Sequence, residues 1–161
     1  MSWQLAQLNI ALFRRPQGDP VNADFIASLD RVNAVAEQQP GLVWRMTGEG
    51  NDAMDVRVGD DPNLVVNLSV WADFESLRDF VYRHDAHLNI MRRRREWFDA
   101  MQAHLVLWWI PGGDRPTIDD AMLRLERLRD DGPTADAFTF REPYPAPDDA
   151  RHAEAAGDAT A

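Results

Sequence analysis

The chain has 161 residues, the size of one ordinary domain with room for a short tail. Apolar residues make up 45% and charged residues 27% of the sequence, which excludes a fibrous repeat and a wholly disordered chain. The 17 Lys and Arg against 27 Asp and Glu give a net charge of −10, which argues against nucleic acid as a partner.

The chain contains no cysteine, so disulfides, thiolate metal ligands and a cysteine nucleophile are excluded. The first residues lack a basic segment followed by an apolar run, and no later run approaches the roughly 20 apolar residues of a membrane span. We therefore expect a cytoplasmic protein with no membrane partner. Six Trp is a high count and indicates wide flat contacts, in the core or around a planar ligand.

The N-terminal part predicts a strand followed by a helix. Residues 3–13 alternate in polarity, which predicts a strand with one apolar face and a second face that carries Gln7 and Asn9. Apolar residues at helical spacing predict a helix over 23–39. Its expected apolar stripe is Phe25, Ile26, Leu29, Val32 and Ala36.

Three strands are expected in the next part of the chain. Residues 42–47 predict the second strand of the sheet, and residues 54–58 predict a short additional strand. Residues 64–71 predict a strand with one uninterrupted apolar face. Its other face carries Asn67, Ser69 and Trp71.

A helical stretch begins near Asp73 and continues to about Ala103, as one bent helix or as two helices that meet at His84-Asp85. The strand that follows, over 104–110, is apolar on both faces apart from its first residue, so both of its faces need a cover.

The C-terminal part predicts a helix and a tail. Thr117 caps a helix that ends before Asp131-Gly132-Pro133, and residues 137–140 are expected to add a short edge strand. Residues 142–161 are rich in Pro and Ala and show no apolar periodicity, which predicts a mobile acidic tail.

This order of elements predicts an α+β fold: a ferredoxin-like βαββαβ antiparallel sheet with its helices on one face, plus an extra C-terminal helix. We expect residues 1–141 to form this domain. The second face of the sheet would need a cover, and a second copy of the chain is the simplest one. A homodimer packed sheet against sheet is therefore expected.

The stretch after Asp85 places two polar residues, His87 and Arg94, in an apolar stripe at helical spacing. The stripe consists of His87, Ile90, Met91, Arg94, Trp97, Phe98 and Met101. In a purely structural interpretation, Arg94 pairs with a core carboxylate or reaches the edge, and His87 is a satisfied core histidine.

In a functional interpretation, the stripe and the polar sheet faces enclose a pocket for a small-molecule substrate. The pocket would hold Gln7, Asn9, Asn67, Ser69, Trp71, His87 and Arg94. Trp71 and Trp97 would supply flat contact for a ring system.

Roles in such a pocket follow from side-chain chemistry. His87 has the only reference pKa near neutrality in the group and is the candidate general base. Arg94 would balance negative charge that develops on an oxygen, and Asn9 or Asn67 would donate hydrogen bonds to that oxygen.

Two other motifs favour weaker alternatives. His84-x-x-His87, with Asp85 and His104, is an alternative metal site, or a haem site in which one histidine is the axial ligand. The run 92–95 of four arginines is spread over all faces of a helix, which is typical of a solvated surface rather than a nucleic-acid patch.

Several segments together resemble a bacterial family of domains of unknown function, over residues 3–140. They are Trp3–Ile10, Pro40–Arg45, Asn67–Trp71, Met91–Phe98 and Leu107–Pro111. That family resembles, more distantly, the dimeric α/β-barrel superfamily of antibiotic biosynthesis monooxygenases.

The resemblance implies two ferredoxin-like subunits joined through their sheets, each with a pocket between sheet and helices. Several members of the superfamily oxidise polycyclic phenols with dioxygen and no cofactor, and others are isomerases, decarboxylases or haem proteins. An Asn, a Trp and a polar residue act in the cofactor-free enzymes, and the matching candidates are Asn67, Trp71 and His87. The extra helix over 117–130 and the segment to Phe140 would cover the pocket or extend the dimer contact.

Together these features predict a dimeric, cofactor-free enzyme in which His87 assists proton removal from an aromatic or polyketide-like substrate, followed by oxygenation or rearrangement. One alternative is a haem protein with His87 or His84 as axial ligand. The other is a non-catalytic dimer in which Arg94 and His87 only stabilise the core.

Overall fold

The structure is a computed structural model of the chain and describes residues 2–47, 61–101 and 104–149. Its centre is a four-stranded antiparallel sheet in the order β2-β3-β1-β4. The strands are β1 (Trp3–Leu12), β2 (Leu42–Arg45), β3 (Leu64–Trp71) and β4 (Leu105–Pro111). The helices are the 3-10 turn η1 (Pro20–Asn22), α1 (Ala23–Glu37), α2 (Phe74–Arg83), α3 (Asp85–Trp97) and α4 (Ile118–Asp131). This is the predicted ferredoxin-like arrangement.

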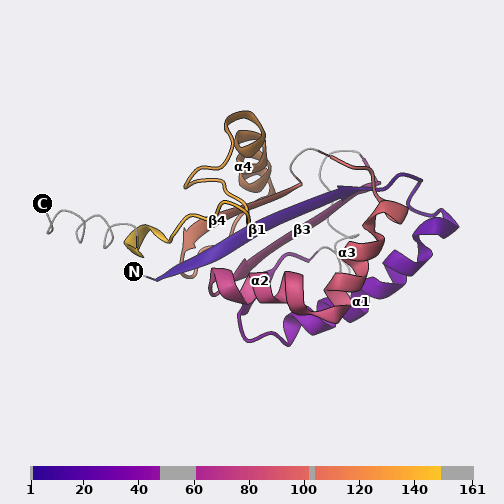
Figure 1. Cartoon of the computed structure of the whole chain (residues 1–161), viewed down its shortest axis with the longest axis horizontal. Helices are drawn as coiled ribbons and strands as arrows, with labels where there is room; N and C mark the ends of the chain where they lie inside the picture. Colours follow the sequence, from indigo (N-terminus) through magenta and orange to yellow (C-terminus); the bar gives the residue numbers. More distant parts are fainter. Residues whose placement is uncertain (1, 48–60, 102–103, 150–161) are drawn as a thin grey trace, which may run out of the picture.

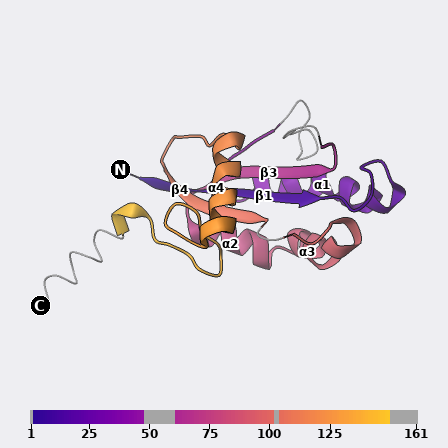
Figure 2. The same ribbon diagram turned by 90° about the horizontal axis from the view of Figure 1, so that it is seen from above.

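The helices form two layers on opposite faces of the sheet. Helices α1, α2 and α3 lie below the sheet in Figure 1, and α4 lies above it. Seen from above, α4 crosses β1 and β4 (Figure 2). The sheet is therefore the middle layer of three, because the chain continues past the ferredoxin-like core and returns over its free face.

Helix α4 covers the sheet face that we expected a second copy of the chain to cover. Its buried residues Ala121, Leu125 and Leu128 pack against the apolar row of the sheet. That row consists of Ala6, Leu8, Ile10, Val66, Leu68, Val70, Val106, Trp108 and Ile110, all buried in the single chain. Among the described residues, the apolar row of the sheet is thus buried within one chain, so it does not require a second copy as its cover. The homodimer itself stays a prediction. The predicted role of this helix over the pocket is also corrected, because α4 lies on the opposite face.

Local rules set most helix ends at the predicted places. Asp73 and Thr117 cap α2 and α4 by accepting hydrogen bonds from the backbone N–H of Ser76 and Asp120. Gly132, with φ of 76°, ends α4. Ile26, predicted in the buried stripe of α1, is 37% exposed, and the buried face continues through Asn33 instead.

The long helical stretch after Asp73 is two helices, separated at His84, whose backbone is extended with φ of −80° and ψ of 123°. Helix α3 ends at Trp97, earlier than predicted, because the chain then turns extended and pairs Phe98 with Phe13. The predicted short strand over 54–58 lies outside the described residues.

The first part of the expected tail is packed against the sheet. An edge strand was predicted over 137–140, but the described residues form isolated bridges there, and in one of them Phe138 pairs with Leu107 at the edge of β4. The indole N–H of Trp109 donates to the carbonyl of Tyr144 at 2.8 Å, and that of Trp3 donates to Asp148 at 2.9 Å. Through these two hydrogen bonds, residues 142–149 contact β1 and β4, where we had expected a mobile segment.

Within the residues that the structure describes, no helix has the length and apolar character required to cross a membrane.

Candidate functional site

A cavity with two adjoining lobes lies between the sheet and the layer of α1, α2 and α3. The first lobe, of about 340 Å³, reaches Trp71 and Phe80. The second, of about 380 Å³, reaches Phe25 and Phe98. We call them the Trp71 lobe and the Phe98 lobe. Both volumes fall in the range of small-molecule pockets.

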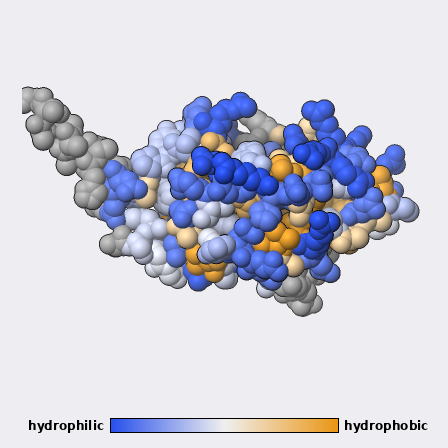
Figure 3. Space-filling view, turned by 60° about the horizontal axis from the view of Figure 1, so that its bottom comes forward, coloured by the Kyte–Doolittle hydropathy of each residue, from blue (hydrophilic) through white to orange (hydrophobic). Residues whose placement is uncertain are grey.

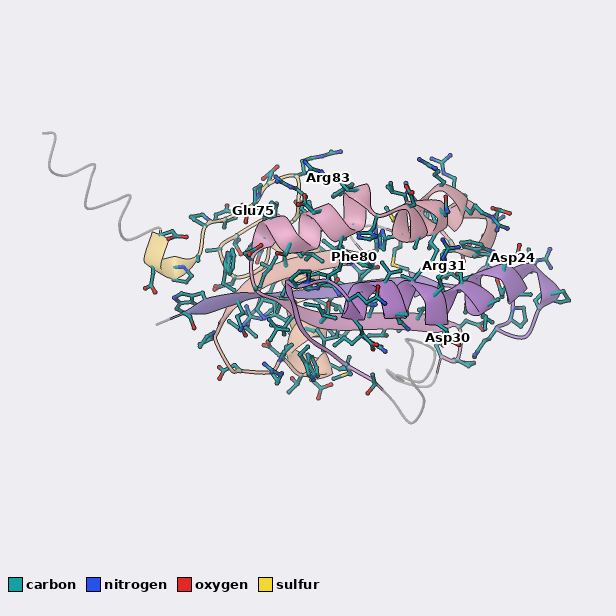
Figure 4. All side chains as sticks on the ribbon, turned by 90° about the horizontal axis from the view of Figure 1, so that it is seen from below. Asp24, Asp30, Arg31, Glu75, Phe80 and Arg83 are labelled. Atoms are coloured by element: carbon teal, nitrogen blue, oxygen red, sulfur yellow. The ribbon has the colours of Figure 1, made fainter. Side chains whose placement is uncertain are left out.

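The two lobes share part of their walls, so they meet in the middle of the cavity. The shared residues are Asn9, Val32, Asn33, Asn67, His87, Met91, Arg94 and His104. Viewed from below, α1 runs alongside α2 and α3, and Phe80 lies on the side of α2 that is turned toward α1 (Figure 4). On the helical side of the molecule, hydrophobic side chains appear in separate patches between hydrophilic ones (Figure 3).

A row of polar side chains forms the sheet wall of the cavity. Strand register places Gln7 directly opposite Ser69 and Asn9 directly opposite Asn67. Because residues two apart on a strand share a face, all four side chains face the helices. The polar faces of the first and third strands, which the sequence could only place separately, therefore meet at this wall.

Hydrogen bonds join this row to Trp71. The amide nitrogen Nε2 of Gln7 donates to Oδ1 of Asn67 at 2.6 Å and to Oγ of Ser69 at 2.8 Å. The indole N–H of Trp71 donates to the same Oγ at 3.0 Å. Ser69 thus accepts two hydrogen bonds, which leaves its hydroxyl proton as a donor for a further group.

The ring of Trp71 forms part of the floor of its lobe. It is buried at 2% exposure and stacks on Phe80, with ring centroids 5.4 Å apart and an interplanar angle of 27°. A ring held by stacking on one side and by its N–H on the edge is rigid, and at 2% exposure it contributes a small area to the wall of this lobe.

His87 enters the cavity wall from the first turn of α3. Its Nδ1 lies 2.9 Å from the carbonyl oxygen of Val81. The break at His84 explains this contact: the last carbonyls of α2 have no backbone N–H partner within the helix, and the imidazole satisfies one of them. Since a carbonyl oxygen can only accept, Nδ1 carries the proton, and Nε2 has the free lone pair of the neutral ring.

The environment of His87 favours this neutral form. Burial lowers the pKa of His87 from its usual value, and the hydrogen bond to the carbonyl of Val81 opposes that shift only in part. The ring also packs at 5.3 Å from the ring of Phe80. His87 therefore has the chemistry of a base at neutral pH.

Arg94 lines both lobes but is exposed, where the periodicity predicted a buried position. Within the described part of the chain it makes no ion pair, and its Nη1 donates to the carbonyl of Met91 at 3.1 Å. The core ion pair of the structural interpretation does not form among the described residues, whereas its other branch, in which Arg94 reaches the edge, agrees with the exposed side chain. Arg94 lines the cavity from this exposed position.

His104 lies at the same junction, next to β4. Partial burial, together with the charges of Arg94 and Arg129, lowers the pKa of His104. The side chain of Arg94 is therefore close enough to make the electrostatic potential at this rim more positive.

Seven of the eight residues that the sequence predicted for the pocket line this cavity. They are Gln7, Asn9, Asn67, Ser69, Trp71, His87 and Arg94. Trp97 lines neither lobe: it is 2% exposed, packs at 5.3 Å from Phe25, and carries the guanidinium of Arg93 at 4.9 Å from its ring. Its ring belongs to the core because α3 ends there and turns that side chain beneath the cavity.

Sequence reasoning missed several residues of the wall. Asn33 is a polar residue at helical spacing from Phe25 and Leu29, the same kind of signal that drew attention to His87. Arg141 lines the Trp71 lobe, and no local pattern indicates that; Phe140 beside it lines the same lobe and belongs to the segment that was expected to cover the pocket.

The alternative metal site does not assemble among the described residues, which contain no group of three or more His, Cys, Asp or Glu side chains that could hold a metal ion. His84 lines neither lobe and packs against Phe80, with ring centroids 5.7 Å apart. In the arginine run, Arg93 binds Glu96 at 2.7 Å and Asp24 at 2.9 Å on the surface, as the solvated-face interpretation predicts.

The profile of the family described as Domain of unknown function (DUF3291) matches residues 4–155. The chain belongs to this family. The predicted resemblance to a family of domains of unknown function is thereby confirmed. No curated protein matches the chain.

Several solved structures are similar to this chain. The cofactor-independent oxygenase SnoaB from Streptomyces nogalater is 21% identical, covers 71% of this chain and 96% of its own, and has a TM-score of 0.46. A putative antibiotic biosynthesis monooxygenase from Chloroflexus aurantiacus is 14% identical, covers 69% of this chain and 96% of its own, and has a TM-score of 0.47. A protein from Pseudomonas aeruginosa is 13% identical, covers 68% of this chain and 94% of its own, and has a TM-score of 0.48. These similarities are remote, and the ferredoxin-like fold is established by the chain's own strand order.

Proposed function

We propose that the protein is a cofactor-independent enzyme that removes a proton from an aromatic small molecule bound between the sheet and α1, α2 and α3. The observation that carries this proposal is the hydrogen bond from Nδ1 of His87 to the carbonyl of Val81. It leaves Nε2 as the basic nitrogen of a ring that lines the cavity.

The polar row of the sheet is suited to receive the oxygen of the same substrate. Proton removal from a ring CH₂ that is conjugated with a carbonyl across the ring moves negative charge onto that carbonyl oxygen. The hydroxyl proton of Ser69 and the amide of Asn67 are the donors proposed for it, and Arg94 adds positive charge at the cavity mouth. The flat ring of Trp71 is proposed to hold the aromatic system in place.

The proposed reaction continues with dioxygen and needs no cofactor. His87 takes a proton from a ring CH₂ that is flanked by aromatic rings, and the resulting carbanion donates electrons to O₂. A C–O bond forms, the O–O bond breaks with return of the proton, and one water leaves. The balance is CH₂ plus O₂ to C=O plus H₂O, with the carbon oxidised and the dioxygen reduced.

Oxygen uptake with anthrone as the probe tests this proposal. We expect the wild-type protein to accelerate oxygen uptake and ketone formation, and His87→Gln to slow the reaction at least about a hundredfold, the usual contribution of a general base. His84→Gln is the matched control, because His84 lies three residues away and lines neither lobe. It should keep the wild-type rate.

Two results would contradict the proposal. One is a folded His87→Gln variant with the wild-type rate, and the other is a wild-type protein that does not exceed the uncatalysed rate. Addition of haemin, followed by the visible absorption spectrum, examines the haem alternative in the same preparations. A histidine-ligated spectrum that disappears in His87→Gln or in His84→Gln would favour haem binding over the proposed oxygenation.

A further inference from the structure

The wall of the Trp71 lobe has a charge opposite to that of the whole chain. Among the described residues, the wall contains three arginines, Arg45, Arg94 and Arg141, and no Asp or Glu. The chain as a whole has 27 acidic residues and a net charge of −10. Such a local excess of positive charge attracts anions into the Trp71 lobe; the wall of the Phe98 lobe, by contrast, also contains Asp99.

Among these arginines, Arg94 is the one at the junction of the two lobes. The neighbouring Arg93 is neutralised by Asp24 and Glu96, and Arg45 is paired with Glu37 at 2.8 Å. Arg94 makes no such pair within the described residues, and the carbonyl of Met91 takes one of its five N–H donors. Its remaining N–H groups are available to a ligand in either lobe.

We infer that the ligand of this cavity is an organic carboxylate, whose carboxylate group binds Arg94 and whose aromatic body lies in the Trp71 lobe. The inference rests on the proposed function only in placing the ligand in this cavity. It adds the chemical class of the ligand and makes Arg94 the residue that selects for it.

The chemistry of the wall favours a carboxylate over a phosphate. The planar guanidinium forms two parallel hydrogen bonds with a planar carboxylate. A phosphate is tetrahedral and would require charged donors for three oxygens, whereas Arg94 is, among the described residues, the only cation in the walls shared by the two lobes, beside the uncharged side chains of Val32, Met91 and three asparagines. The apolar walls then bind the hydrocarbon part of the acid.

The exposure of Arg94 sets the size of the expected effect. A charged hydrogen-bonded pair at a solvent-exposed mouth is screened by water and salt. We expect about a tenfold preference for the acid over a neutral molecule of the same shape, at the low end of the range for charged hydrogen bonds. The preference should shrink as the salt concentration rises.

Two probes of equal shape test this inference: 2-naphthoate and its neutral counterpart 2-naphthamide. Their affinities for the full chain are measured by titration, with the indole N–H resonances observed by NMR. Trp71 lines the cavity, and Trp108 lies on the other face of the sheet. Binding in the cavity should shift the resonance of Trp71 and leave that of Trp108 in place.

The decisive comparison is Arg94→Gln against Arg92→Gln. Both remove one positive charge from an exposed position of α3, but Arg92 lines neither lobe. Arg94→Gln should weaken naphthoate binding about tenfold and leave naphthamide binding unchanged. Arg92→Gln should change neither affinity.

The failures of the two proposals are distinguishable. If both probes shift Trp71 with equal affinity, or if Arg92→Gln weakens naphthoate as much as Arg94→Gln, the preference for an acid is overturned while the cavity remains a ligand site. If neither probe shifts Trp71, the inferred carboxylate ligand is refuted, while oxygen uptake with anthrone decides the proposed function separately.

Discussion

The Nδ1 atom of His87 lies 2.9 Å from the carbonyl oxygen of Val81, so the end of one helix determines the tautomer of a residue in the next. The extended backbone at His84 makes this contact possible, since it ends α2 and starts α3 one residue later. The protein thereby obtains a neutral imidazole with a defined basic nitrogen at a cavity wall.

The first prediction concerns the titration of His87. Because burial lowers the pKa of His87, its ring should titrate with a midpoint below the usual value of 6.5. A pH titration of the histidine NMR signals, assigned with the His87→Gln variant, measures this midpoint. If the proposed base role holds, kcat/KM should decline with falling pH with a midpoint below 6.5, the same midpoint that the NMR titration gives for His87. A midpoint above 6.5 would contradict both the burial and the neutral state.

The second prediction concerns stability against pH. Below about pH 6.5 the unfolded chain binds a proton on His87 that the folded chain, with its lower pKa, still excludes. The free energy of unfolding should therefore decrease as the pH falls from 6.5 through the folded pKa of His87. The free energy of unfolding is measured by urea unfolding at about pH 7.5 and about pH 5.5. Its decrease between these two pH values should be smaller in His87→Gln than in wild type. Equal decreases would mean that His87 does not contribute to the pH dependence.

The third prediction concerns the hydrogen bonds of the sheet wall. Ser69 is 3% exposed and accepts hydrogen bonds from both Gln7 and Trp71. Ser69→Ala removes that acceptor and leaves the buried indole N–H without a partner, which should cost about 1–3 kcal/mol of stability.

Ser28→Ala is the control for Ser69→Ala in urea unfolding. Ser28 is half-buried on α1, and its hydroxyl donates to the carbonyl of Phe25 in its own helix. Since Ala is the better helix former, this change should alter stability by less than about 0.5 kcal/mol. Equal stability of the two variants would show that the network at Ser69 is unimportant for folding.

The fourth prediction concerns the cover of the second sheet face. Leu125 of α4 is fully buried against the sheet, and Leu123 on the same helix is 54% exposed. Leu125→Ala should lower the free energy of unfolding by about 2–5 kcal/mol, because it opens a space in the core. Leu123→Ala should change it by less than about 0.5 kcal/mol. A small loss in Leu125→Ala would imply that α4 does not cover this face in solution, and that a second copy of the chain does.

Short-range patterns determined the elements of the fold. The alternation over 64–71 placed β3 at its observed bounds, and side-chain caps at Asp73 and Thr117 placed the starts of α2 and α4. Strand alternation also separated the polar faces of β1 and β3 correctly, because side chains two apart on a strand must share a face. These features depend on neighbours in sequence, so the sequence alone determined them.

Contacts between distant elements were decided only by the tertiary structure. Periodicity indicates which side of an element is buried but not what buries it, so a second chain and α4 were equally consistent with the apolar face of the sheet. For the same reason the sequence could not separate Trp97 from Arg94. Both lay on one predicted stripe, but Trp97 is buried in the core and Arg94 is exposed at the cavity mouth. The partner of His87 followed from a break of a single residue between two helices, and the path of the backbone after such a break is set by packing across the whole molecule.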